Sequence, residues 1–465
     1  MNKMLKVISH FFPSTTLVKL FFDSALLFAA VLLAMFMTDS AHGVADWRVV
    51  VPSGLFFALV MMLVNTAMGL YRPVAGDSFL HLLAKILFSF FVSLPLAFAV
   101  FPVLPWTEFT TEAVEISSVL VVGAVLVVRG WSSRRSAPLF LARRMLVVGT
   151  GTDAAVLERE LSQLDGQGLT VVGFLPANGE DSCKVDPGKV LRDSGSLQQI
   201  ARKLRAGEVV VAVREQRGGA LPLRELLDCK LAGIKVYDLS TFFERFRGQV
   251  RIDSLKASWL IYGDGFRQDW GRTLVKRCFD LIAASVLLVL ALPVMLVTAI
   301  LILLEDGAPV LYRQERVGLG GKTFKVIKFR SMRSDAEKDG RPRWATSGDD
   351  RVTRIGRFIR RTRIDELPQL VNVLVGEMSL VGPRPERPYF VDQLTRSISF
   401  YAVRHCVKPG VTGWAQVRYQ YGATVDDAIQ KLQYDLYYVK NHTLVLDTLV
   451  LFETIRVVLT GEGAH

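Results

Sequence analysis

The chain has 465 residues, of which 51% are hydrophobic, and its 56 lysine and arginine residues outnumber 44 acidic residues to give a formal net charge of +12. So high a hydrophobic share excludes a wholly soluble enzyme of ordinary composition, and part of the chain is expected in a bilayer. The positive charge favours anionic partners such as lipid headgroups and nucleotides.

Four apolar stretches open the chain, each close to the ~20 residues that cross a hydrocarbon layer. They cover residues 17–37, 49–70, 86–104 and 113–128. We predict an N-terminal four-helix transmembrane bundle over residues 1–135. Basic residues flank this bundle at both ends and between its second and third stretches, whereas the other two loops carry mainly acids. Because basic loops stay in the cytoplasm, both ends of the bundle are predicted on the cytoplasmic face.

In residues 136–250, short β-branched runs alternate with helical stretches, a pattern typical of a Rossmann-like α/β domain. The first run leads into Gly149-Thr-Gly151-Thr-Asp-Ala154, a G-x-G-x-x-A turn of the kind that can seat a pyrophosphate. A dinucleotide site also requires an acid at the end of the next strand, and this strand ends in Gly173-Phe-Leu-Pro176. We therefore expect a structural or regulatory domain that binds no NAD.

A fifth apolar stretch runs from Phe279 to Leu304 and contains Pro293. Lys276, Arg277 and Asp280 lead into it, so the segment as a whole covers residues 276–304. It is long enough to span, yet the residues that follow are strongly basic, and moving them across the membrane would violate the charge rule. We predict a re-entrant helix that dips into the membrane and returns. Pro293 removes one backbone donor and clashes with the preceding turn, which supplies the bend. A fifth span kinked at Pro293 is the alternative.

Two adjacent carboxylates, Asp365 and Glu366, follow a run of arginines in Arg360-Arg-Thr-Arg-Ile-Asp-Glu-Leu-Pro368. The guanidinium charges favour ionised carboxylates. On a helix, neighbouring side chains point about 100° apart, so the two acids are expected to do different jobs. One can attack or bind a metal while the other handles protons or completes the coordination. The alternative is a solvated, salt-bridged helix face.

Several long motifs stand in order over residues 276–441: KRCFDLIAASVLLVLALP, KFRSM, RIDELPQLVNVLVGEMSLVGPRP, KPGVTGWAQV and YYVKN. Together they resemble the catalytic domain of the bacterial polyprenyl-phosphate hexose-1-phosphate transferases, a family of monotopic phosphoglycosyl transferases. The layout of the whole chain is similar to that of the large members. It implies a membrane protein of the α+β class, with the bundle, the Rossmann-like domain and an α/β catalytic domain over residues 251–465. Many relatives have Ser-Pro at the bend, where this chain has Leu292-Pro293.

The resemblance implies that Asp365 attacks the sugar-bearing phosphate of a UDP-sugar and expels UMP. Undecaprenyl phosphate then attacks the phosphosugar-aspartate, which is the first membrane step of exopolysaccharide or other glycoconjugate synthesis. Mg²⁺ is the implied cofactor, with Asp365 and Glu366 as its ligands, and Glu366 is chosen for magnesium binding or proton handling. The candidates for holding substrate phosphates are basic residues in or near the matching motifs: Lys328, Arg330, Arg360 and Arg384.

By this resemblance the chain is expected in the bacterial inner (cytoplasmic) membrane as a multi-pass protein, with its catalytic domain on the cytoplasmic face. The lipid bilayer, the UDP-sugar and undecaprenyl phosphate are the expected partners, and a homodimer is left open, as is the identity of the hexose. No nucleic acid is expected, because the positive charge lies beside membrane segments.

Two rival functions are weighed against this one. A membrane-anchored NAD-dependent nucleotide-sugar dehydratase or epimerase would require a Tyr-x-x-x-Lys pair, but the residue four positions before Lys440 is Leu436. A non-catalytic scaffold of a polysaccharide-export assembly would use its basic face only to grip lipid. Such a scaffold would tolerate the loss of the Asp365 carboxylate.

Overall fold

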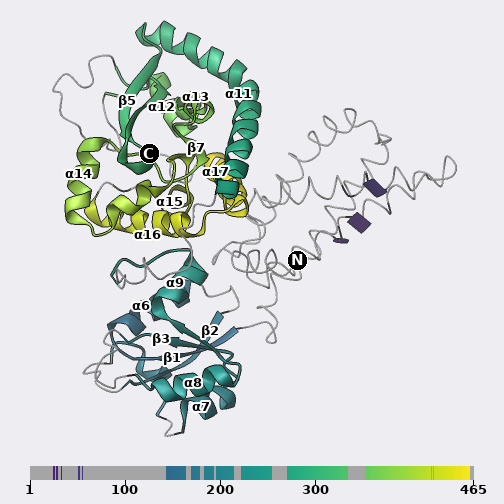
Figure 1. Ribbon diagram of the computed structural model, residues 1–465, viewed down its shortest axis with the longest axis vertical. Coiled ribbons are helices and arrows are strands. Elements are labelled where there is room, and N and C mark those ends of the chain that lie inside the picture. Colours follow the sequence, from purple (N-terminus) through teal and green to yellow (C-terminus); the bar gives the residue numbers. More distant parts are fainter. Residues whose placement is uncertain are drawn as a thin grey trace, which may run out of the picture. The chain divides into compact units, whose positions relative to one another are not determined.

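The computed structural model describes residues 143–163, 169–177, 183–192, 195–213, 221–253, 270–333, 351–419, 422 and 424–460, with a few isolated helical positions between 25 and 55. The chain divides into two compact units, Met1–Arg245 and Phe246–His465 (Figure 1). Apart from the isolated positions, the predicted bundle over residues 1–135 lies outside the described residues.

The first unit contains a four-stranded parallel sheet in the order β2-β1-β3-β4, as its alternating pattern predicts. The strands are β1 (Arg143–Val148), β2 (Leu169–Leu175), β3 (Glu208–Val211) and β4 (Lys235–Asp238). Every residue of β3 is buried, as expected for a central strand covered on both faces. The connecting elements are α6 (Thr152–Gln163), η2 (Pro187–Lys189), α7 (Leu197–Lys203) and α8 (Leu223–Leu231), and α9 (Leu239–Arg247) follows β4.

The predicted glycine turn joins β1 to α6. Gly149 has φ +122°, and a Cβ there would collide with the backbone carbonyl of Ala212, so only glycine fits this close approach. The segment after β2 folds back onto the turn, where the Lys184 amide donates to the Thr150 carbonyl at 2.8 Å. The Glu158 carboxylate of α6 holds the same segment by accepting from Lys189 Nζ at 2.9 Å.

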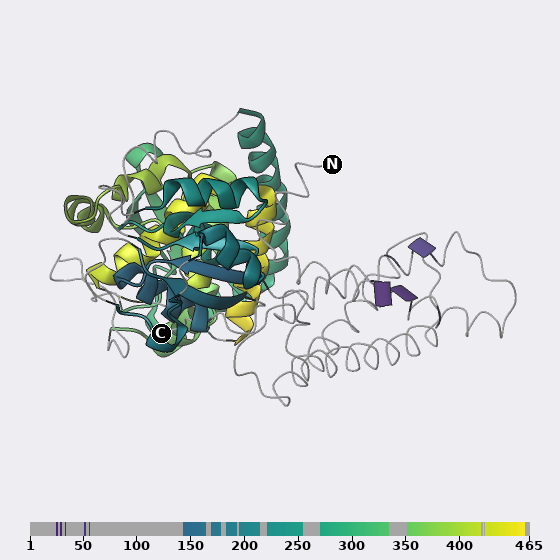
Figure 2. The same cartoon turned by 90° about the horizontal axis from the view of Figure 1, so that it is seen from below.

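The second unit combines two small sheets with helices. Figure 2 shows its teal to yellow ribbons from a second direction. The strands β5 (Leu311–Val317) and β6 (Thr323–Phe329) form an antiparallel hairpin, and β7 (Ser379–Val381) pairs in parallel with β8 (Gly410–Thr412). The hairpin turns through η3 (Leu319–Gly321). The other elements are α11 (Trp270–Asp306), α12 (Arg354–Arg361), η4 (Ile364–Glu366), α13 (Gln369–Val375), α14 (Pro388–Ser397), η5 (Tyr401–Cys406), α15 (Trp414–Arg418), α16 (Val425–Asn441) and α17 (Leu444–Thr460).

The long helix α11 contains Pro293 and runs for 37 residues. Among the described residues it is the one helix long and apolar enough to cross a membrane. Its middle exposes large apolar side chains, including Val289 at 71% and Leu290 at 69%, which in water would be costly. Figure 1 shows α11 running along one side of the unit and then turning sharply before it reaches β5.

Charged side chains fasten the start of α11 to the second unit. Lys276 Nζ lies 3.2 Å from Asp280 on the same helix and 2.9 Å from Asp447 on α17. The two carboxylates are almost wholly buried. Arg277 donates to the last carbonyls of α13, those of Val373 and Leu374, at 2.6 and 2.8 Å.

The end of α11 is fastened to the same unit. The Glu305 carboxylate accepts from the Arg354 and Ile355 amides at the start of α12, where a negative charge stabilises the helix. Arg330 donates to the carbonyls of Asp306 and Gly307 at 2.8 and 2.7 Å, so it caps the C-terminus of α11. The entry and the exit of the apolar helix therefore lie on one globular body.

Candidate active site

The acidic pair lies on a short 3₁₀ turn between two helices. The two acids are predicted on a helix, but α12 ends at Arg361 and η4 covers Ile364–Glu366. Arg363 interrupts the helix because it adopts the left-handed conformation, with φ 59° and ψ 15°. A non-glycine residue in this region is strained, and such strain is typical of functional sites. On a 3₁₀ turn, neighbouring side chains diverge by about 120°, so Asp365 and Glu366 face different surroundings.

Glu366 is surrounded by cations and is 7% exposed. Its Oε1 accepts from Arg384 Nη2 at 2.6 Å and from Lys328 Nζ at 3.1 Å, while its Oε2 lies 3.6 Å from Arg363 Nη1. Burial by itself would raise the pKa of this carboxyl, but Arg384, Lys328 and Arg363 outweigh it and hold the pKa well below its usual range. Glu366 is therefore a fixed negative charge that organises the basic side chains.

Asp365 is half-buried, and in the part of the chain that the structure describes no hydrogen bond or ion pair engages its carboxylate. Burial raises the pKa of Asp365 to about 6, and the adjacent Glu366 charge acts in the same direction against Lys328, Arg384 and Arg363. Its oxygens are thus available to an incoming electrophile or metal ion. The two neighbours therefore have different surroundings, since Glu366 is held by cations and Asp365 is open.

The β5–β6 hairpin supplies part of the basic lining. In the antiparallel register Lys328 lies opposite Tyr312, so Lys328, Gln314 and Arg316 project from one face. Burial lowers the pKa of Lys328, although Glu366 opposes this change. Asn372 joins the hairpin to α13 by accepting from the Ile327 amide at 3.1 Å and donating to the Lys325 carbonyl at 2.9 Å. This link holds Lys328 in register with the acidic turn.

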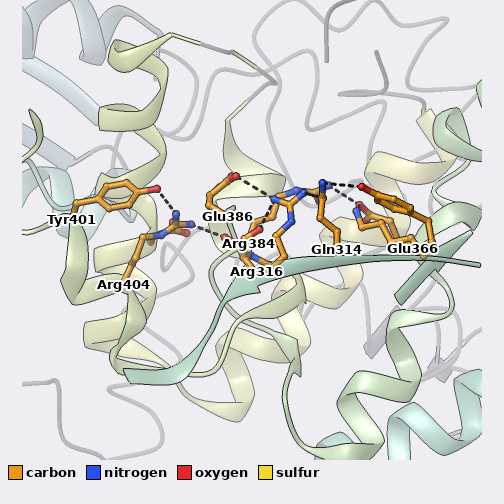
Figure 3. A network of polar contacts seen from close by, with 11 residues as sticks. Gln314, Arg316, Glu366, Arg384, Glu386, Tyr401 and Arg404 are labelled. Atoms are coloured by element: carbon orange, nitrogen blue, oxygen red, sulfur yellow. Dashed lines mark hydrogen bonds and ion pairs between the residues drawn. The ribbon is translucent and has the colours of Figure 1, made fainter. Parts of the chain in front are cut away.

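Arg384 comes from the loop after β7. Gly382 and Gly410 allow β7 and β8 to approach so closely that a Cβ on either glycine would collide with the backbone of the other strand region. Pro383 and Pro385 flank Arg384 and restrict its backbone. The Glu366 charge raises the pKa of Arg384 further above its ordinary value. Figure 3 shows Arg384 between Glu366 and a second group of polar residues.

Of the predicted site residues, the structure brings Asp365, Glu366, Lys328 and Arg384 together. It does not bring Arg330 into this group, because that guanidinium caps α11. Arg360 lies half-buried on α12, and no hydrogen bond or ion pair joins it to the acidic pair in the described residues. Pro293 lies within α11, as predicted.

Several residues of the site were not predicted. Arg316 Nη2 donates to Gln314 at 2.6 Å, and its Nη1 lies 3.4 Å from Glu386. The spacing of Gln314 and Arg316 could have predicted them together, because residues two apart on a strand project from the same face. Arg363 belongs to the arginine run expected beside the acids, but its left-handed backbone has no signature in the neighbouring residues.

The acidic pair offers a magnesium ion only part of a coordination shell. Within the described ranges, no group of three His, Cys, Asp or Glu side chains could hold a metal. Magnesium, however, usually binds one or two carboxylates together with waters and substrate phosphates. The open Asp365 oxygens fit that role, and so does Glu366 Oε2, whose ion pair is the long one at 3.6 Å. The residues fit a metal that shares its shell with a phosphorylated ligand.

A carboxylate beside fixed cations has a defined chemical capacity. Lys328, Arg384 and Arg363 can neutralise a phosphate, and an open carboxylate at Asp365 can attack phosphorus. Phosphoryl transfer needs such charge neutralisation and positioning more than it needs a strong base.

Comparison with known proteins gives matches in the same region. The family model described as "Bacterial sugar transferase" matches residues 271–461. UDP-N-acetylgalactosamine-undecaprenyl-phosphate N-acetylgalactosaminephosphotransferase of Aeromonas hydrophila is 47% identical over 249 residues, 52% of this chain and 56% of that protein. The UDP-glucose:undecaprenyl-phosphate glucose-1-phosphate transferase of Escherichia coli K12 is 35% identical over 289 residues, 60% of this chain and 61% of its own length.

A protein of Xanthomonas campestris with the same name as the Escherichia coli relative is 33% identical over 361 residues. That alignment covers 75% of this chain and 73% of the relative. The chain thus spans 56% and 61% of the length of the first two relatives, and more of the third.

Proposed function

Because the chain belongs to the bacterial sugar transferase family, we propose that it transfers a hexose-1-phosphate from a UDP-sugar to undecaprenyl phosphate with release of UMP. This reaction would initiate the assembly of a polysaccharide or another glycoconjugate on the lipid carrier. The observation that carries the proposal is the contrast within the acidic pair. Glu366 is held by three cations, whereas the neighbouring Asp365 is half-buried and open.

In the first step a carboxylate oxygen of Asp365 attacks the sugar-bearing phosphorus of the UDP-sugar. A P–O bond forms to Asp365 as the bond to the bridging oxygen breaks, and UMP leaves with that electron pair. Lys328 and Arg384, which lie beside Glu366, would stabilise the negative charge that spreads over the phosphate oxygens. The product is a phosphosugar-aspartate, an acyl phosphate of the kind that aspartate nucleophiles form.

In the second step a phosphate oxygen of undecaprenyl phosphate attacks the same phosphorus. The bond to Asp365 breaks, the carboxylate is regenerated, and the lipid leaves as undecaprenyl diphosphate-sugar. The same basic side chains serve both steps, because in each step negative charge develops on the oxygens of the same phosphate group. Glu366 keeps these side chains oriented between the steps.

We propose Mg²⁺ as the cofactor, which Asp365 and Glu366 would hold together with the phosphorylated substrate. When bound, it would neutralise phosphate charge and polarise the P–O bond that breaks. Glu366 Oε1 would stay with Lys328 and Arg384, at 3.1 and 2.6 Å.

We propose a re-entrant path for α11, with both ends on the cytoplasmic face of the bacterial inner membrane. The support is that Lys276 at its entry and Arg330 and Glu305 at its exit are fastened to one unit. A shallow helix would hold the acidic pair at headgroup height, where a soluble nucleotide and a lipid phosphate can meet.

The test is UMP release by the purified full chain in detergent with undecaprenyl phosphate, Mg²⁺ and a panel of UDP-sugars. The panel includes glucose, galactose and their N-acetylated forms, because the curated relatives include both glucose and N-acetylgalactosamine transferases. We expect release with at least one sugar and a loss of about 10³-fold or more in Asp365→Asn. The matched control is Asp392→Asn, an exposed aspartate on α14. No release with any sugar, or full release by Asp365→Asn, would contradict the proposal.

A further inference from the structure

The loop that carries Arg384 is held by its carbonyl groups. Pro383 and Pro385 have no N–H, so this segment has few donors with which to fix itself. Four consecutive carbonyls are instead each bound by a different donor: Pro383 by the Gly410 amide, Arg384 by Arg404 Nη2, Pro385 by Arg316 Nη1 and Glu386 by the Val317 amide, at 3.0, 2.8, 3.1 and 2.9 Å.

Arg404 is the buried member of this set. Its side chain is 7% exposed and pairs with Asp435, which is 3% exposed, at 2.8 Å. Its Nη1 donates to the Tyr401 hydroxyl at 2.6 Å. One planar guanidinium thus serves three acceptors, among them the Arg384 carbonyl, and a lysine could not reproduce that fork. Figure 3 shows Arg404 between Tyr401 and Arg384.

Stability alone gives little reason for a charge pair at this depth. Desolvating two ions is costly, and well-packed apolar residues are often as stable or more so. A buried pair does, however, fix one geometry, because the alternatives leave a charge unpaired in the interior. Here the buried pair fixes the main chain of Arg384, because Arg404 donates to the Arg384 carbonyl. The Arg384 side chain in turn donates to Glu366 at 2.6 Å.

We infer that Arg404 is a positioning residue for the transfer reaction, which holds the Arg384 guanidinium at the acidic pair through the Arg384 carbonyl. This inference rests on the proposed function. Arg404 itself touches neither Asp365 nor Glu366 by any hydrogen bond or ion pair in the described residues. Its effect on the reaction passes through Arg384, and Asp435 and Tyr401 hold Arg404 in turn.

The experiment is a double-mutant cycle on UMP release, measured with excess full-length enzyme in detergent. Arg404→Lys is expected to lower the rate by about 10- to 100-fold, since a displacement of about 1 Å at a catalytic group has effects of this size. In an Arg384→Ala background the same substitution is expected to change the remaining rate by less than about 3-fold, because there is no guanidinium left to position. Arg396→Lys, on exposed α14, is the matched control and should equal the wild type.

Equal losses from Arg404→Lys in both backgrounds would overturn the inference, since they would indicate a general structural effect. Wild-type activity in Arg404→Lys would overturn it as well. If Arg404→Lys does not fold, Pro385→Ala replaces it in the cycle, because it loosens the same loop without disturbing the buried pair. The same dependence on Arg384 is then expected. A wild-type chain that releases no UMP defeats the proposed function, whereas failure of this inference leaves the wild type active.

Discussion

Asp365 and Glu366 have the same functional group and different surroundings. Three basic side chains lie around Glu366, whereas Asp365 is half-buried without a hydrogen bond or ion pair in the described residues. Their pKa values move apart, that of Glu366 down and that of Asp365 up, because cations dominate at one and burial dominates at the other. Acids whose environments separate them in this way are suited to separate roles.

The raised pKa of Asp365 predicts an acid limit to the reaction. The attacking form is the carboxylate, so protonation at low pH removes the nucleophile, and the rate is expected to fall at low pH. The pKa of Asp365 is about 6 without a metal, and bound Mg²⁺ would lower it, so the fall is expected below about pH 6. The Lys328 charge lowers the pKa of Asp365, so Lys328→Met should shift the fall in rate to higher pH. The measurement is the pH profile of kcat/KM for UMP release, with Lys322→Met at the exposed hairpin turn as the control. If the rate of Lys328→Met falls at the same pH as that of the wild type, the assignment of this fall to Asp365 is contradicted.

At the scale of elements, the start of α11 depends on one lysine. Lys276 is the cation beside Asp447, which is fully buried, and Asp280, which is 2% exposed. Tyr438 adds a contact to Asp447 at 2.7 Å and one to the Val381 carbonyl at 2.8 Å. These contacts link the start of α11 to β7, the strand that precedes Arg384.

Removing that lysine is expected to cost stability. Lys276→Met leaves two carboxylates in the interior without their cation, and breaking a buried pair in this way typically costs about 3–5 kcal/mol. Chemical unfolding in detergent measures the change. The exposed Arg396–Asp392 pair on α14 is the control, because Arg396→Met should change stability by less than about 1 kcal/mol. Equal effects of the two substitutions would show that the network does not hold α11.

The elements with strong local patterns were predicted correctly from the sequence. The β-branched runs of residues 136–250 correctly predicted the four parallel strands. The acidic pair was predicted on a helix, because the left-handed Arg363 has no signature in its neighbours. Arg330 was predicted at the substrate, but its partners lie 24 residues earlier at the end of α11. The contacts of Arg404 likewise depend on tertiary packing that no local pattern encodes.

At the scale of the whole molecule, the proposed topology concerns the two ends of α11. Trp270 is 79% exposed before the apolar stretch, and Lys322 is exposed after it. In a chain without its four native cysteines, Trp270→Cys and Lys322→Cys are expected to react with an impermeant maleimide in inverted membrane vesicles and not in right-side-out ones. The positive-inside rule and the shared anchoring of both ends require this result. Labelling of the two positions from opposite sides would indicate a fifth span instead.

The central claim is that Asp365 becomes covalently linked to the phosphosugar. The most direct measurement incubates the full chain with Mg²⁺ and its UDP-sugar in the absence of undecaprenyl phosphate and analyses the protein by mass spectrometry. We expect a burst of UMP that does not exceed the amount of enzyme, a mass increase of one hexose phosphate on the peptide that contains Asp365, and loss of that mass when undecaprenyl phosphate is added. Turnover with the lipid but no adduct at Asp365, or an adduct on another residue, would contradict the account.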